Sequence, residues 1–209
     1  MTSPDIRDFV DGYLAEDDVL LAARVRALEM GCNPVGASVG AALSFLAATT
    51  SARAVVEVGT GAGVSGLWLL RGMASDGVLT SIDVDPEKLR AARAAFTEAG
   101  YGPSRLRLIN GLGLEVLPRL TDGGYDLVFV DVGVVDYPRY LQEAVRLLRP
   151  GGIVVFDDVL RDTRIADDSD LDPSIGALRE VTRQARESEV LVPLLLPLGD
   201  GLLAAVRRG

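Results

Sequence analysis

The chain has 209 residues, of which 48% are hydrophobic and 24% charged, as in an average globular protein. Its formal charge of −9, from 21 basic and 30 acidic residues, argues against a nucleic-acid partner, because phosphate backbones are bound by clustered Lys and Arg. The chain has no histidine and a single cysteine, Cys32, which excludes His-dependent nucleophiles, His-bearing zinc sites and an intramolecular disulfide. Any catalysis must rely on carboxylates, a metal held by oxygen, or a cofactor.

The chain shows no targeting or membrane-spanning segment. Residues 1–18 are acidic and lack the positive and apolar regions of a signal peptide. The longest apolar run, 190–198, is interrupted by Pro193 and Pro197 and is too short to cross a bilayer. We therefore expect a cytoplasmic protein that binds neither membranes nor nucleic acid.

The N-terminal residues have the apolar spacing of helices. Residues 5–30 have this spacing throughout, and 31–36 contain the Asn-Pro and Gly residues of a turn. A further helix is expected over 38–50, with Ser38 as its cap.

The middle of the chain alternates short apolar runs with amphipathic segments. The apolar runs, rich in β-branched residues as buried parallel strands are, cover 54–58, 78–82, 106–109, 127–130 and 153–156. Helical spacing covers 64–72, 86–99, 114–120 and 137–148. This alternation predicts a doubly wound α/β sheet. We expect one domain over 1–209, with a helical extension over 1–37 and an α/β core over 38–209.

The C-terminal residues depart from this alternation. A helix is expected over 173–187, followed by apolar runs over 190–196 and 202–206. The turn at 198–201 contains Gly-Asp-Gly, which indicates a hairpin. The last strand should therefore be antiparallel to its neighbour.

A glycine-rich loop follows the first predicted strand. In open parallel sheets, ligands bind beyond the carboxyl ends of the strands. Gly59, Gly61 and Gly63 lie at such an end, where the lack of a Cβ lets the backbone turn sharply and approach a ligand. We favour a ligand-binding loop, and an ordinary strand-to-helix turn is the alternative.

An acidic residue, Asp83, ends the second predicted strand. It lies some twenty residues after the glycine loop, where a carboxylate can accept hydrogen bonds from ribose hydroxyls of NAD or of S-adenosylmethionine. Its alternative role is to cap the helix that begins near Pro86, although Asp85 suits that role better.

Glu57 favours one of these two cofactors. A glutamate inside an apolar strand is costly to bury without a partner. The ammonium and sulfonium groups of S-adenosylmethionine would supply one, whereas the pyrophosphate of NAD would be repelled. The alternative is a buried Glu57 that accepts hydrogen bonds from backbone amides.

Four segments together resemble a known family. They are VVEVGTGAGVS at 55–65, LTSID at 79–83, YDLVFVD at 125–131 and DDVLR at 157–161. This set resembles the cation-dependent O-methyltransferases, the catechol and caffeoyl-CoA type with its bacterial relatives. The resemblance implies a class I methyltransferase, Rossmann-like fold with a seven-stranded sheet. It implies S-adenosylmethionine as cofactor, and the residues expected to bind it are Glu57, Gly59, Thr60, Gly61, Gly63, Ser65, Asp83, Val84, Gly111, Gly113 and Asp131.

The same resemblance implies a metal site. Asp131, Asp157 and Asp158 would hold Mg²⁺ or another divalent cation, and Asp131 is also expected to be catalytic. Carboxylate oxygens are ligands that suit Mg²⁺, and a bound cation would lower the pKa of a substrate hydroxyl. The alternative is that these acids are solvated loop residues that cap the segments after them.

The sequence also departs from the family pattern. Asp158 stands where the family usually has Asn, and after Asp131 the second acid and the catalytic lysine are missing. Val134 occupies the position of that lysine, so a lysine restored there would be expected to supply a base. Lys88, the one lysine of the chain, is not expected at the metal.

These observations favour an S-adenosylmethionine-dependent O-methyltransferase that acts on a small, catechol-like substrate with the help of a divalent metal. The family resemblance also suggests a homodimer. One alternative is a catalytically altered or degenerate S-adenosylmethionine-binding protein, which the missing lysine favours. An NAD-dependent oxidoreductase is less favoured, because the chain has no Tyr-x-x-x-Lys pair.

Overall fold

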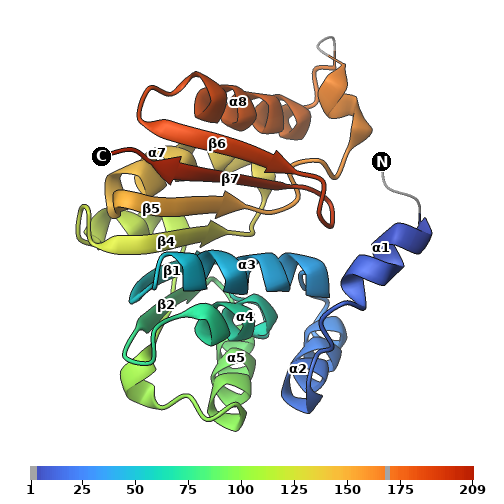
Figure 1. Ribbon diagram of the computed structural model, residues 1–209, viewed down its shortest axis with the longest axis vertical. Coiled ribbons are helices and arrows are strands. Elements are labelled where there is room, and N and C mark those ends of the chain that lie inside the picture. The colour runs from blue at the N-terminus through green and yellow to red at the C-terminus, as the bar shows by residue number, and fades with distance from the viewer. Residues whose placement is uncertain (1–3, 168–169) are drawn as a thin grey trace.

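The predicted apolar runs form the strands of one seven-stranded sheet (Figure 1). The computed structural model describes residues 4–167 and 170–209. The strands are β1 (Ala54–Val58), β2 (Val78–Asp83), β3 (Leu106–Asn110), β4 (Tyr125–Val130), β5 (Leu148–Phe156), β6 (Leu191–Leu196) and β7 (Leu202–Arg207).

The order of the strands is β3-β2-β1-β4-β5-β7-β6. Strands β1 to β5 are parallel, and β7 is antiparallel to both β5 and β6. The predicted doubly wound sheet and its antiparallel last strand are therefore confirmed. Strands β2 and β3 are added on one side of β1, and β4 and β5 on the other. The strand order therefore reverses beside β1, where the loops after β1 and β4 border a crevice.

The helices follow the predicted alternation with the strands. They are α1 (Pro4–Asp11), α2 (Asp18–Glu29), α3 (Ala37–Thr49), α4 (Val64–Gly72), α5 (Pro86–Glu98), α6 (Gly113–Val116), α7 (Tyr137–Leu147) and α8 (Pro173–Glu187). Short 3₁₀ turns are η1 (Pro103–Arg105), η2 (Leu117–Arg119), η3 (Val134–Asp136) and η4 (Thr163–Ala166).

Two of the predicted helical segments are divided in the structure. The helical residues predicted over 5–30 form α1 and α2, and α2 begins where Asp17 accepts a hydrogen bond from the Leu20 amide (3.0 Å). The helix predicted over 114–120 is a short α6 followed by the 3₁₀ turn η2, because Pro118 has no amide to continue an α-helix.

The predicted cap of α3 is also wrong. Gly36, and not Ser38, is the residue before this helix, and it makes no side-chain cap. The amide of Ser38 instead donates to Asp11 Oδ1 at 3.1 Å. A carboxylate from α1 therefore satisfies the free amide at the start of α3, which links the N-terminal extension to the core.

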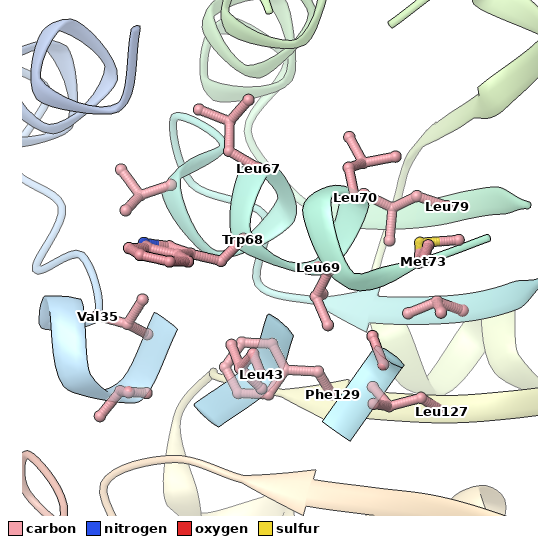
Figure 2. Close-up of a cluster of buried hydrophobic side chains, with 14 of the residues drawn as sticks. Val35, Leu43, Leu67, Trp68, Leu69, Leu70, Met73, Leu79, Leu127 and Phe129 are labelled. Atoms are coloured by element: carbon pink, nitrogen blue, oxygen red, sulfur yellow. The ribbon is translucent and has the colours of Figure 1, made fainter. Parts of the chain in front are cut away.

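The sheet has a hydrophobic core on each face. Helices α2 to α5 pack over one face, where Figure 2 shows Leu43 of α3, Leu69 of α4 and Phe129 of β4 gathered together. Helices α7 and α8 pack over the other face with their own buried cluster. Both faces of a parallel sheet are thus covered, as such sheets require. In residues 4–167 and 170–209, no helix has the length and apolar character needed to cross a membrane.

Candidate functional site

The glycine loop between β1 and α4 adopts a backbone that other residues rarely adopt. Gly59, Gly61 and Gly63 all have positive φ, at +95°, +51° and +95°. A Cβ on Gly59 would overlap the carbonyl oxygen of Asp131, and one on Gly63 would lie 3.0 Å from the Cα of Ala92. Gly59 therefore allows the ends of β1 and β4 to touch, and Gly63 allows α5 to approach the loop.

Asp83, at the end of β2, holds the glycine loop in place. Its Oδ2 accepts from the Gly61 amide and its Oδ1 from the Asp85 amide, both at 2.9 Å. Asp85 caps α5 by accepting from the Glu87 amide at 2.8 Å, with Pro86 in the first turn, as predicted. Because capping falls to Asp85, and each carboxylate oxygen of Asp83 can accept a further hydrogen bond, Asp83 remains able to bind a ligand hydroxyl.

Glu57 is fully buried and its partners are hydroxyl groups. Ser65 Oγ donates to its Oε1 at 2.6 Å, and Ser81 Oγ donates to its Oε2. Burial raises the pKa of Glu57 to about 7. The hydrogen bonds from the two hydroxyls lower this pKa, but their effect is smaller than that of burial. The backbone-amide alternative is not what the structure shows. Ser65, and not Glu57, lies on the cavity wall, so Glu57 acts behind Ser65.

A cavity of about 460 Å³ lies over the glycine loop. Its walls combine the loop, the end of β2, the start of α4 and the turn between α2 and α3. The predicted site residues on its wall are Gly59, Thr60, Gly61, Ser65, Asp83, Val84, Asp131 and Asp158.

A second cavity of about 250 Å³ adjoins the first and shares Gly59, Asp83 and Val84 with it. Gly111 and Gly113 lie on its wall, as predicted, beside Tyr140 of α7. The loops after β1, β2, β3 and β4 thus surround one elongated binding space. The structure brings together the predicted cofactor residues, except that Glu57 and Gly63 lie behind its wall.

Three predicted acids line one cavity beyond the ends of β4 and β5. Asp131, Asp157 and Asp158 line a third cavity, of about 150 Å³. Burial, and then the charges of Asp157 and Asp158, raise the pKa of Asp131 well above its usual value. Burial raises the pKa of Asp157 to about 7, and it also raises the pKa of Asp158. The group is therefore electrostatically unfavourable when no cation faces it.

Asp157 has an oxygen without a partner. Its side chain is 6% exposed, and its Oδ1 is buried and makes no hydrogen bond. Asp158, at φ +60°, adopts the left-handed backbone that Asn and Asp tolerate better than most residues. Among the residues that the structure describes, no three Asp, Glu, Cys or His side chains converge closely enough to hold a metal ion as they stand.

Several residues at the site were not predicted. Lys88 of α5 and Arg161, which follows the paired aspartates, line the cavity over the glycine loop, as does Asn33 of the turn before α3. Asp200, on the turn between β6 and β7, lines the acidic cavity. Lys88 lies in the first turn of α5, five residues after Asp83, and this closeness in sequence could have revealed it. Arg161 follows Asp158 by three residues, whereas Asn33 and Asp200 reach the site through tertiary folding alone.

The fold and the site define a class: a Rossmann-like enzyme with a glycine-rich cofactor loop and an acidic group beside it. A family model described as O-methyltransferase matches residues 18–208. A Mycobacterium ulcerans (strain Agy99) protein named "Putative O-methyltransferase" is 55% identical over 197 residues, which cover 94% of this chain and 88% of that protein. The chain therefore belongs to the O-methyltransferase family, and the NAD-dependent alternative is set aside.

Solved structures agree with this assignment. A Corynebacterium glutamicum protein superimposes with a TM-score of 0.92 at 35% identity, over 98% of this chain and 96% of that one. The O-methyltransferase TomG from Streptomyces achromogenes, involved in tomaymycin synthesis and solved in complex with SAM, gives a TM-score of 0.90 at 28% identity, over 100% of both chains. The class I methyltransferase fold predicted from the sequence is thus confirmed.

Proposed function

We propose that this chain binds S-adenosylmethionine and transfers its methyl group to a hydroxyl oxygen of a small, catechol-like substrate. In this reaction the bond between sulfur and the methyl carbon breaks, a bond between oxygen and that carbon forms, and the hydroxyl proton is released. The observation that carries the proposal is the elongated space bordered by Gly59 and Asp83 in a chain of the O-methyltransferase family.

The residues of this space suit the parts of the cofactor. Asp83 would accept hydrogen bonds from the ribose hydroxyls, through lone pairs that its two backbone partners leave free. Val84, Gly111 and Gly113 would border the adenine in the second cavity. The methionine end would lie over the glycine loop near Ser65 and the Asp131 carboxylate, which suits its ammonium group.

Glu57 would serve as a positioning residue. Its Oε1 accepts a hydrogen bond from Ser65 Oγ at 2.6 Å, which fixes the orientation of the Ser65 hydroxyl. Ser65 is thereby kept at the cavity wall in one orientation, which lowers the entropy lost when the cofactor binds. This role differs from the direct contact expected from the sequence, because Glu57 lies behind Ser65.

We also propose that Asp131, Asp157 and Asp158 would hold a divalent cation. The donor set has the chemistry that a hard cation requires, because it offers carboxylate oxygens and includes the buried, unpartnered Oδ1 of Asp157. These side chains would have to draw together around the cation to hold it. When bound, the cation would lower the pKa of the substrate hydroxyl. The position of the family's lysine is occupied by Val134, which is 5% exposed and packs in the core on the α7 and α8 face.

A homodimer is proposed on the apolar surface of the N-terminal helices. Exposed apolar side chains on α1 to α3 and on the turn between α1 and α2 include Phe9, Tyr13, Val25, Leu28 and Phe45. Large apolar side chains exposed in such number on one part of the chain suit a protein interface. Light scattering coupled to size-exclusion chromatography would report the mass in solution.

Isothermal titration calorimetry tests the cofactor assignment. The demethylated product, S-adenosylhomocysteine, should bind with measurable heat in a one-to-one ratio, and NAD should give none. A thermal melt should rise with the product and stay unchanged with NAD, because only a ligand of the folded state stabilises it. Binding of NAD, or of neither ligand, would contradict the assignment.

A further inference from the structure

We propose that Asp200, on the turn between β6 and β7, is a fourth carboxylate of the cation site formed by Asp131, Asp157 and Asp158. This inference rests on the proposed cation site. It extends that site to the antiparallel hairpin at the far end of the chain, which the predicted ligand set does not include.

The turn that carries Asp200 is fixed against the segment that follows Asp158. The Leu160 amide donates to the Asp200 carbonyl oxygen at 2.7 Å, and the Val159 amide donates to the Gly201 carbonyl oxygen at 3.0 Å. Gly201 has φ +96°, and a Cβ there would lie 2.5 Å from Leu160. The hairpin turn and the paired aspartates therefore form one unit held by backbone contacts.

The cavity beside this unit is lined from several sides by acids. Its wall carries Asp131 from the end of β4, Asp157 and Asp158 from the end of β5, and Asp200 from the hairpin. Asp157 is 6% exposed and its Oδ1 has no hydrogen-bond partner. Buried carboxylate oxygens are normally satisfied, so this unpartnered oxygen points to a cation that the site would receive.

The charges of this group are poorly balanced within the protein. Among the described residues, Arg161 pairs with the group, with its Nη1 3.6 Å from Asp158 Oδ2, and both side chains remain partly exposed. Asp200 lines the same cavity of about 150 Å³ as Asp157 and Asp158. Two further basic side chains border the group, Lys88 in the cavity with Asp131 and Asp158 and Arg7 in a cavity with Asp200. The four carboxylates still outnumber the three basic groups, and this excess of negative charge favours a divalent cation.

The side chain of Asp200 has no structural role that competes with this one. It makes no hydrogen bond or ion pair within residues 4–167 and 170–209, because the turn is held by its backbone. Asp200→Asn should therefore fold normally. Removing one of four like charges should raise the melting temperature of the protein without metal, whereas loss of a structural contact would lower it.

The test is titration of Mn²⁺ alone into the full chain, followed by calorimetry and by the melting temperature. Asp200→Asn should weaken Mn²⁺ binding by roughly 10- to 100-fold, the usual cost of removing a group that supports a metal site. Asp157→Asn should abolish it. Asp76→Asn is the matched control: it removes the same charge at the opposite edge of the sheet, where Asp76 pairs with Arg53, and should leave the affinity unchanged.

The possible outcomes distinguish the role of Asp200 from the proposed cation site and from the proposed cofactor. Wild-type affinity in Asp200→Asn and in a second variant, Asp200→Ser, together with weak binding in Asp157→Asn, would overturn the role of Asp200 and leave the cation site standing. Absence of Mn²⁺ binding in the wild type would overturn both. Binding of S-adenosylhomocysteine in the same samples would show that the cofactor assignment is independent of either failure.

Discussion

Gly59 and Asp131 are in direct contact at the carboxyl ends of the neighbouring parallel strands β1 and β4. A Cβ on Gly59 would overlap the carbonyl oxygen of Asp131, while the Asp131 amide donates to the Val58 carbonyl oxygen at 2.9 Å. The glycine loop and the acid that follows β4 thus sit on adjoining backbones. This contact brings the proposed methyl donor next to the proposed cation site.

Gly59→Ala should be severely destabilising. The substitution adds a steric clash with backbone to a residue at φ +95°, and the expected loss is at least about 3 kcal/mol of unfolding free energy. Gly100→Ala is the matched control, because Gly100 has φ +85° with open space around it, so only backbone strain of about 1 kcal/mol applies. Urea unfolding measures both. Equal losses would show that the contact with Asp131 does not constrain the loop.

Asp83→Asn should weaken cofactor binding. Loss of a charged hydrogen-bond acceptor costs about 1.5 to 3 kcal/mol, which corresponds to roughly a 10- to 100-fold weaker affinity for S-adenosylhomocysteine. The neighbouring Asp85→Asn should leave the affinity unchanged, because Asn caps a helix about as well as Asp. Calorimetry distinguishes the two variants. A similar loss in both would mean that Asp83 acts only by shaping the start of α5.

Glu57→Gln should change how stability depends on pH. The folded protein holds the Glu57 proton up to a pKa of about 7, whereas the unfolded chain releases it near 4.5. Below pH 4.5 Glu57 is protonated in both the folded and the unfolded state, so its ionisation does not lower the free energy of unfolding. As the pH rises to 7 only the unfolded state ionises, so the wild type loses roughly 3 kcal/mol relative to Glu57→Gln.

The measurement for Glu57 is urea unfolding at pH 5 and at pH 7.5, without ligand. The stability difference between the wild type and Glu57→Gln should shift in favour of the variant at the higher pH. The exposed Glu115→Gln serves as a control, for which this difference should stay constant. A constant difference for Glu57→Gln as well would show that its carboxyl is ionised throughout.

Val134→Lys should not restore a catalytic base. The family pattern places a lysine here, but in this chain Val134 is 5% exposed and packs with the core on the α7 and α8 face. A buried ammonium at this position should cost roughly 2 to 4 kcal/mol. Val135→Lys, at a site 55% exposed, should be tolerated. Thermal melts test this, and an increase in methyl transfer by Val134→Lys would contradict it.

The strands and the site loops could be predicted because their signals are local. Short β-branched runs bounded by Gly or Asp identified the strands, and the Gly-Asp-Gly turn identified the hairpin. The pairing of Asp85 with Pro86 fixed the start of α5, as the structure confirms. In each of these cases a few adjacent residues determine the local structure by themselves.

The remaining features depend on contacts between segments far apart in the sequence. Ser38 looked like a helix cap, but the amide at that position is satisfied by Asp11 from another helix. The hydroxyl of Ser81 reaches Glu57 because the parallel register of β1 and β2 places these two residues side by side. Asp200 joins the acidic group only when the hairpin docks. These contacts could not be predicted from residue spacing, because each joins segments that are distant in the sequence.

The most direct test is methyl transfer itself. The wild type, with S-adenosylmethionine carrying a trideuterated methyl group and with Mg²⁺, is offered a panel of catechols and simple phenols, and the products are analysed by mass spectrometry. The account predicts a product that carries the intact labelled methyl on oxygen, formed more slowly when the cation is chelated and not at all by Asp131→Asn. No labelled product, in samples where S-adenosylhomocysteine and Mn²⁺ are both shown to bind, would contradict it and leave a cofactor-binding protein that does not methylate these hydroxyls.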